Sequence, residues 1–277
     1  MIAVCLLNSH RRLHSRLTED VAANEAFRWM ADPGDADIVI HPVPPWPDPQ
    51  APQRHFWLRP DLLSRMLVFS QDDNPIPWAP GVFASLAASH PDVAGARGGF
   101  YVYHAHYEPD LAGALDPRPD GEPEFLWAFV GSAATWPQVR EPLFALNDER
   151  GLRIDTAEWN RHHRWQFEGA GRSARSEALR SYANKLHQAK FIVCPRGAGL
   201  SSVRLFEAMR AGKCPVIVSD GWLAPPFVDW ESCVVRVRES DLRHLPELLR
   251  NASGMRPCLA PALGARGSDA TRRRRCC

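Results

Sequence analysis

The chain has 277 residues, of which 45% are hydrophobic, and its formal net charge at pH 7 is +1. This length is sufficient for two domains that each bury a core of their own. A nearly neutral chain gives no general reason to expect nucleic acid or an acidic membrane surface as a partner, so any recruitment must come from local charge.

The N-terminal half alternates between strand and helix patterns. Apolar runs predict strands at 2–7 and 36–41, and the stretch between them predicts a helix from Thr18 to Met30. The proline-rich run 42–52 predicts an extended loop. The opening MIAVCLLNSHRR has neither a basic leader nor a cleavage site, so it predicts a core strand instead of a signal peptide. No apolar run reaches about eighteen residues, and the sequence therefore predicts no membrane span.

Two further strands are predicted at 66–69 and 100–104. The first runs into SQDDNPIPW, a polar segment that would face a cleft if the sheet is parallel. Asp72 and Asp73 in this segment are candidates for a general base. An aspartate before Asn-Pro is equally typical of an Asx turn, and this alternative stays open.

Three other patterns are weaker indications of a site. His104 and His106 flank one residue, so both could face one side of a strand and bind a metal, but no third ligand follows at a fixed spacing and we predict no metal site. The basic run RHHR at 161–164 fits a solvated loop better than a functional patch. Ser201 and Ser202 lack a GxSxG elbow, which argues against a hydrolase. The seven cysteines include no CxxC pair, so we expect buried thiols.

A second domain is predicted after the polar linker DPRPDGEP at 116–123. A strand at 125–130 runs into Gly131 and Ser132, and a helical stretch with Arg140 follows. We interpret Gly131 and Ser132 as ligand contacts and Arg140 as a candidate phosphate ligand. A plain tight turn explains Gly131 equally well.

The stretch 191–220 is the most informative, because it predicts a strand, a glycine-rich loop, a helix and a second strand in succession. Short apolar runs at 191–194 and 214–218 predict buried parallel strands. Between them apolar residues recur at helical spacing, with N-cap candidates at 201–202 and Gly212 where a C-terminal cap belongs. The pattern is that of one βαβ unit.

The loop of this unit predicts a phosphate-binding site, because ligands of open α/β sheets bind beyond the carboxyl ends of the strands. Glycines let the backbone approach an anion, the N–H groups at the start of a helix point towards it, and arginines supply charge-assisted bonds. The candidate residues at this edge are Arg196, Gly197, Gly199, Ser201, Ser202, Arg204 and Asp220.

Glu207 lies too deep in the predicted helix to touch the same anion, about 7.5 Å along the axis. A carboxylate at that position suits ribose hydroxyls. The alternative is that the glycines only shape a turn and that Arg204 and Glu207 form an ordinary surface pair. The loop is neither GxGxxG nor a Walker loop.

These residues resemble the C-terminal half of the exostosin family of glycosyltransferases. The matching motifs, in order, are CPRG at 194–197, SS at 201–202, RLFEA at 204–208, AG at 211–212, PV at 215–216, SD at 219–220, Trp222, PF at 226–227 and ESD at 239–241. The resemblance implies a GT-B fold, in which two Rossmann-like domains with parallel sheets face each other across a cleft. It also implies a nucleotide-sugar donor held mainly by the C-terminal domain, no metal bound by the protein, and inversion of the anomeric centre.

We therefore expect an N-terminal acceptor-side domain at 1–122, a nucleotide-sugar-binding domain at 123–252 and an irregular, disordered basic tail at 253–277. The tail lacks the periodicity of the brace helix with which GT-B enzymes usually end. Animal and plant relatives are typically anchored in the secretory pathway, and this chain departs from them there. We expect a cytoplasmic protein, with at most peripheral membrane contact.

The expected activity is transfer of a sugar from a nucleotide diphosphate sugar to a hydroxyl of a glycan or glycolipid, as in polysaccharide biosynthesis, without a further cofactor. Arg196, Arg204 and the loop N–H groups would stabilise the departing diphosphate. Glu207 would hold the ribose, and Asp72 or Asp73 would take the proton of the acceptor hydroxyl. The alternative is a nucleotide-sugar-binding protein with weak or no turnover, an idea motivated by the irregular tail.

Overall fold

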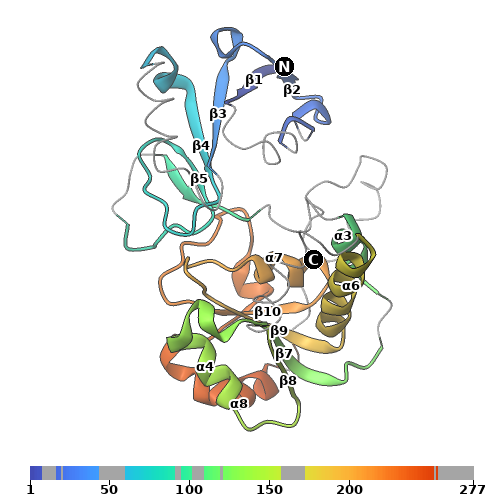
Figure 1. Ribbon diagram of the computed structural model, residues 1–277. Coiled ribbons are helices and arrows are strands. Elements are labelled where there is room, and N and C mark those ends of the chain that lie inside the picture. The colour runs from blue at the N-terminus through green and yellow to red at the C-terminus, as the bar shows by residue number, and fades with distance from the viewer. Residues whose placement is uncertain are drawn as a thin grey trace.

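The computed structural model describes residues 1–7, 17–19, 21–43, 60–90, 95–101, 109–118, 121–156, 172–252 and 254. The chain forms two lobes, each with its own parallel sheet (Figure 1). We call the described residues up to 101 the N-terminal lobe and those from 109 onward the C-terminal lobe. Two lobes built on parallel sheets confirm the expected α/β fold class.

The N-terminal lobe contains a six-stranded sheet in the order β2-β1-β3-β4-β5-β6, and all its pairs are parallel. Its strands are β1 (Ile2–Leu6), β2 (Phe27–Trp29), β3 (Ile38–Val43), β4 (Met66–Ser70), β5 (Gly81–Phe83) and β6 (Ala96–Gly98), with the 3₁₀ helices η1 (Pro33–Asp35) and η2 (Pro60–Arg65) between them. The strands expected at 2–7, 36–41 and 66–69 are confirmed as β1, β3 and β4.

One sequence prediction in this lobe is wrong. The helix expected from Thr18 to Met30 is helical only at 17–19 and 21–22 in the described residues. A turn follows in which the Asn24 side chain accepts a hydrogen bond from the Ala26 N–H (3.0 Å), and the chain then enters β2. Of the strand expected at 100–104, residues 100 and 101 follow the end of β6 and are not part of a strand, and residues 102–104 lie outside the described residues.

The C-terminal lobe contains a five-stranded sheet in the order β11-β10-β9-β7-β8, again with parallel pairs. Its strands are β7 (Phe125–Gly131), β8 (Gly151–Asp155), β9 (Ala189–Pro195), β10 (Cys214–Val218) and β11 (Val235–Arg236). Its α-helices are α3 (Pro109–Ala114), α4 (Pro137–Ala145), α6 (Arg172–His187), α7 (Val203–Arg210) and α8 (Leu245–Asn251), and its 3₁₀ helices are η4 (Ala133–Thr135), η5 (Trp230–Ser232) and η6 (Glu239–His244).

Helices cover both faces of this second sheet. Alternate residues of β7 point to opposite faces, so Ala128 and Val130 join a core with α3, α6 and α7, while Trp127 and Phe129 join a core with α4 and α8. Figure 1 shows α3 and α6 on one side of the sheet and α4 and α8 on the other. Burial on both faces explains why these strands are continuous apolar runs in the sequence.

The predicted βαβ unit is confirmed as β9, α7 and β10. Gly212 adopts φ 65°, the left-handed conformation that favours glycine just after a helix. Ser202 occupies the N-cap of α7. Leu111 of α3 and Leu115, which directly follows α3, belong to the core of the C-terminal lobe, so this core draws on residues that precede the predicted linker.

The lobes are joined by backbone pairing between residues 86–88 and 221–223. Ala87 and Trp222 form an antiparallel bridge. The flanking hydrogen bonds run from Ala88 N to Gly221 O (2.8 Å) and from Leu223 N to Leu86 O (2.9 Å). The buried indole of Trp222 donates to Ala84 O (3.0 Å). Two segments far apart in the sequence therefore lock the lobes together.

Apolar contacts extend this junction. Phe100 of the N-terminal lobe makes edge contacts with Phe206 and Phe227 of the C-terminal lobe, at centroid distances of 6.3 and 6.2 Å. The backbones of the two lobes approach closely at Gly98, where a Cβ atom would lie 2.2 Å from Leu223 O. Only glycine fits at such a distance, because the opposing atom belongs to the backbone.

Gly98→Ala should therefore lower the free energy of unfolding by about 1 to 3 kcal/mol, the usual cost of forcing an extra methyl group into a packed site. Urea unfolding followed by circular dichroism measures the change. Gly113→Ala in α3 is the matched control, because no heavy atom lies within 4 Å of its added Cβ and alanine favours a helix. Equal stability of the two variants would contradict the close approach at Gly98.

Candidate functional site

The carboxyl ends of β7 and β9 are held together by the side chain of Arg140 on α4. Its guanidinium donates to the carbonyls of Arg196 (2.9 Å), Ser132 (3.1 Å) and Pro195 (3.4 Å). Arg140 is only 8% exposed. The predicted site residue is therefore at the predicted edge of the sheet, but these donors bind the backbone of the strand ends. Its role as a phosphate ligand stays a prediction.

A second guanidinium lies beside the first. Arg204 of α7 lies 5.1 Å from the Phe129 ring centroid, and Arg140 lies 5.8 Å from the same ring. Burial, together with the charge of Arg204, lowers the pKa of Arg140. Gly131 makes room for this arrangement, since a Cβ there would lie 2.6 Å from a terminal nitrogen of Arg204. Two neighbouring cations favour the binding of an anion between or beside them.

Several buried polar atoms at this edge have no hydrogen-bond partner within the described part of the chain. They include Ser201 Oγ, Arg204 Nε and Ser219 Oγ. Ser201 lies in the loop between β9 and α7, and Ser219 directly follows β10, so both belong to segments that follow two neighbouring strands. An unpaired buried polar atom costs about 1 to 3 kcal/mol, and a polar ligand would remove that cost.

The first turn of α7 lies next to these atoms. Ser202 is the N-cap residue, and its side chain makes no capping hydrogen bond. The start of a helix leaves backbone N–H groups unsatisfied and carries a partial positive charge. Together with Arg204, this helix end can bind a phosphate.

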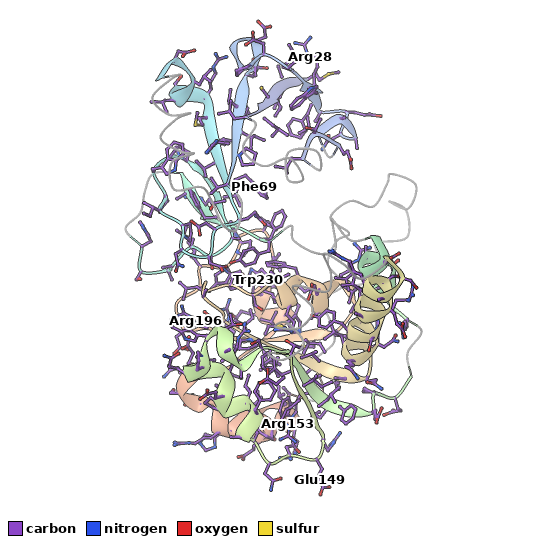
Figure 2. All side chains as sticks on the ribbon, in the orientation of Figure 1. Arg28, Phe69, Glu149, Arg153, Arg196 and Trp230 are labelled. Atoms are coloured by element: carbon purple, nitrogen blue, oxygen red, sulfur yellow. The ribbon has the colours of Figure 1, made fainter. Side chains whose placement is uncertain are left out.

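Arg196 and Asp220 lie at the same edge of the sheet, and their side chains contact other parts of the protein. The guanidinium of Arg196 stacks over the ring of Trp136, at 4.2 Å from its centroid. Figure 2 labels Arg196 above α4, on the side towards the N-terminal lobe. Asp220 and Glu239 exchange hydrogen bonds, from Glu239 N to Asp220 Oδ1 (3.1 Å) and from Asp220 N to Glu239 Oε1 (3.3 Å). This pair fastens the start of η6 to the end of β10.

Glu207 is buried at 6% exposure and accepts a hydrogen bond from the Tyr182 hydroxyl of α6. Burial and the adjacent Glu207 charge raise the pKa of Tyr182, so the phenol stays protonated. No sequence pattern indicates this contact between Glu207 and α6. The contact orients the carboxylate, and its role towards ribose stays a prediction.

The two candidate bases have different surroundings. Asp72 accepts a hydrogen bond from Asn74 N (3.1 Å), which is the Asx turn that the sequence left open. Burial, with the nearby charge of Asp73, raises the pKa of Asp72. The Asp73 carboxylate accepts a 2.6 Å hydrogen bond from the Tyr101 hydroxyl. Asp73 is also the one that touches the glycine-rich loop, since a Cβ at Gly199 would lie 2.8 Å from Asp73 O.

Sequence reasoning missed Ser85 and Tyr101. Ser85 Oγ accepts a 3.0 Å hydrogen bond from Ser201 N, across the junction of the lobes. Ser85 follows the three-residue strand β5, which was too short to recognise from its pattern. Polar residues at the carboxyl end of a parallel strand were the available signal.

Other predicted features lie outside the described residues. These are His104, His106, the run 161–164 and all of the tail from 255 onward. Within the described ranges, no helix is long and apolar enough to cross a membrane. In the same ranges, no three His, Cys, Asp or Glu side chains gather in a metal-binding arrangement.

Comparison with known proteins gives a consistent family assignment. The model of the Exostosin GT47 domain matches residues 103–252. The chain is 39% identical over 77 residues to an exostosin-1 homologue of Caenorhabditis elegans, and the aligned region is 27% of this chain and 20% of that protein. It is 28% identical over 137 residues to exostosin-1 of Drosophila melanogaster, covering 46% and 18% respectively.

A probable glycosyltransferase of Arabidopsis thaliana is 36% identical over 76 residues, which is 26% of this chain and 14% of that protein. This chain thus spans a fifth or less of the length of these three curated relatives. Among solved structures, that of Acinetobacter baumannii MurG is similar with a TM-score of 0.39 and 13% identity, covering 91% of this chain and 93% of that one.

Proposed function

The chain belongs to the exostosin GT47 family, whose domain model matches more than half of it, and from this premise we propose that it is a glycosyltransferase that uses a nucleotide diphosphate sugar. The acceptor in this proposal is a hydroxyl of a glycan or glycolipid. The family membership supports transfer of a sugar in general terms. The proposal adds the donor, the acceptor class and the residues that act on them.

The observation that carries the proposal is the set of unpartnered buried polar atoms beside the start of α7. Ser201 Oγ and Arg204 Nε have no hydrogen-bond partner in the described part of the chain. These two residues flank the first residue of α7, Val203, and its N-cap, Ser202. A diphosphate has oxygens that can accept hydrogen bonds from these groups. Its negative charge is also attracted by the guanidinium groups of Arg204 and the nearby Arg140. A neutral ligand would satisfy only the hydrogen bonds.

In the proposed mechanism the acceptor oxygen attacks the anomeric carbon in line as the bond to the diphosphate breaks. Negative charge develops on the departing diphosphate, where Arg204, Arg196 and the N–H groups of the loop stabilise it. Asp73 takes the proton of the acceptor hydroxyl. A single in-line displacement inverts the anomeric centre. The arginines supply the positive charge that a bound metal supplies in other transferases, so the proposed reaction needs no metal held by the protein.

Arg204→Met should weaken the binding of a nucleoside diphosphate about 10- to 100-fold, because a charge-assisted hydrogen bond contributes about 1.5 to 3 kcal/mol. Titration calorimetry with UDP and GDP in the presence of EDTA measures the affinity and shows whether binding requires a metal. Arg210→Met removes the same charge from the other end of α7 and is the control. Arg210 pairs with Asp116, away from the loop, so its loss should leave the affinity unchanged.

Unchanged affinity in Arg204→Met, or an equal loss in Arg210→Met, would remove Arg204 from the donor site. Turnover is measured separately, as the release of nucleoside diphosphate from a bound sugar nucleotide. Tight binding without any release would favour a nucleotide-sugar-binding protein over a transferase.

Glu207→Gln should weaken the binding of the nucleoside diphosphate and of the plain nucleoside by similar factors, about tenfold, because both contain the ribose that the carboxylate would bind. Inorganic pyrophosphate, which has no ribose, should bind equally well to both proteins. The three affinities are measured by the same calorimetry. A loss that includes pyrophosphate would instead mean that Glu207 acts on the anion site itself, for example by orienting Arg204.

A further inference from the structure

A chain of hydrogen bonds connects the glycine-rich loop of the C-terminal lobe to Asp73 in the N-terminal lobe. The Ser201 N–H donates to Ser85 Oγ (3.0 Å), Ser85 is hydrogen-bonded to the Tyr101 side chain, and the Tyr101 hydroxyl donates to Asp73 Oδ1 (2.6 Å). The chain therefore crosses the junction of the lobes and ends on a proposed catalytic group.

The two end groups fix the direction of this chain. A backbone N–H can only donate and an ionised carboxylate can only accept, so each hydroxyl between them must accept from the Ser201 side and donate towards Asp73. Burial and the negative charge of Asp73 raise the pKa of Tyr101, so its hydroxyl stays protonated and remains a donor. Aligned hydrogen bonds of this kind strengthen one another in a buried environment.

The linking groups are well shielded from water. Ser85 is 2% exposed, while Tyr101 and Ser201 are each 6% exposed. The Gly199 backbone also packs closely against the Ser85 side chain and the Asp73 backbone, because a Cβ at Gly199 would lie 2.4 Å from Ser85 Oγ and 2.8 Å from Asp73 O. The loop and the Asp73 segment therefore cannot shift independently.

Asp73 has a competing electrostatic attraction. Burial and the Arg204 charge lower the pKa of Arg140, and the Asp73 charge opposes part of this lowering, so the carboxylate is within electrostatic reach of that guanidinium. Without a fixed donor, the Asp73 side chain would be free to turn towards this positive charge. Tyr101, from the same lobe as Asp73, is the group that holds one carboxylate oxygen in place, through a 2.6 Å hydrogen bond.

We propose that Tyr101 is a positioning residue for Asp73, and that through Ser85 it couples the orientation of this carboxylate to the loop that holds the donor. The inference rests on the proposed function, in which Asp73 takes a proton from the acceptor. It adds a role for Ser85 and Tyr101 of the N-terminal lobe. When the diphosphate fixes the conformation of the loop, these hydrogen bonds also fix the orientation of the Asp73 carboxylate.

The test is a double-mutant cycle on donor hydrolysis, with water as the acceptor. Water attacks the anomeric carbon, its proton passes to Asp73 and the diphosphate leaves, so the reaction uses the same base. The probe is whichever of UDP-glucose, UDP-galactose and GDP-mannose gives the largest thermal shift. Variants are compared for kcat and for donor KM, and melting temperatures confirm that each is folded.

Tyr101→Phe keeps the ring and should lower kcat about 10- to 100-fold, the effect of losing a hydrogen bond to a charged group, with donor KM within about twofold. Asp73→Asn should lower kcat about 10²- to 10⁴-fold. In the double variant Tyr101→Phe should add no further loss, because the carboxylate on which it acts is already gone. Ser85→Ala should lower kcat in the same direction but less, and it replaces Tyr101→Phe if that variant does not fold.

Tyr182→Phe is the matched control, since it removes another buried tyrosine hydroxyl that donates to a carboxylate, that of Glu207. The fold-losses in kcat caused by Tyr182→Phe and by Asp73→Asn should multiply in the double variant, because the two sites are independent. The proposal is overturned if Tyr101→Phe and Asp73→Asn also multiply, if Tyr101→Phe changes only donor KM, or if Asp73→Asn has normal turnover. None of these results affects nucleotide binding in Arg204→Met, so failure of this inference is distinct from failure of the donor site.

Discussion

The buried guanidinium of Arg140 is the interaction on which this edge of the molecule depends. Arg140 donates at once to three carbonyls at the ends of β7 and β9, those of Ser132, Pro195 and Arg196. Placing a charge there is costly, and the neighbouring Arg204 adds repulsion. The carbonyl dipoles and the Phe129 ring offset part of this cost. What remains is a positively charged sheet edge beside a helix N-terminus, and this is the physical basis for the anionic ligand that we propose.

The second constraint is the contact between the lobes, which places residues of the N-terminal lobe beside this edge of the sheet. Pairing of residues 86–88 with 221–223 brings Ser85 and the Asp73 segment against the glycine-rich loop. The site is therefore made from both lobes, with the cations supplied by the C-terminal lobe and the carboxylate by the N-terminal lobe. This division matches the chemistry of glycosyl transfer, in which one group stabilises the leaving anion and another accepts a proton.

The sequence predicted what is local and periodic. The βαβ unit of β9, α7 and β10 was predicted because apolar runs, caps and glycines all agreed within one short stretch. The helix expected at 18–30 was wrong because the Asn24 turn and the pairing of β2 with β1 outweighed helical spacing. Contacts between distant segments left no local signal. The Arg140 hydrogen bonds, the Tyr182 contact of Glu207 and the path from Ser201 to Asp73 all join residues more than twenty positions apart or from different elements, and they became visible only in three dimensions.

The most direct measurement is a crystal structure of the protein in complex with the nucleoside diphosphate that binds it best. The account predicts phosphate oxygens at hydrogen-bonding distance, about 2.7 to 3.2 Å, from Arg204 Nε and Ser201 Oγ, with the start of α7 directed at the diphosphate. Phosphates bound elsewhere on the chain, with Arg204 Nε and Ser201 Oγ still lacking partners, would contradict it.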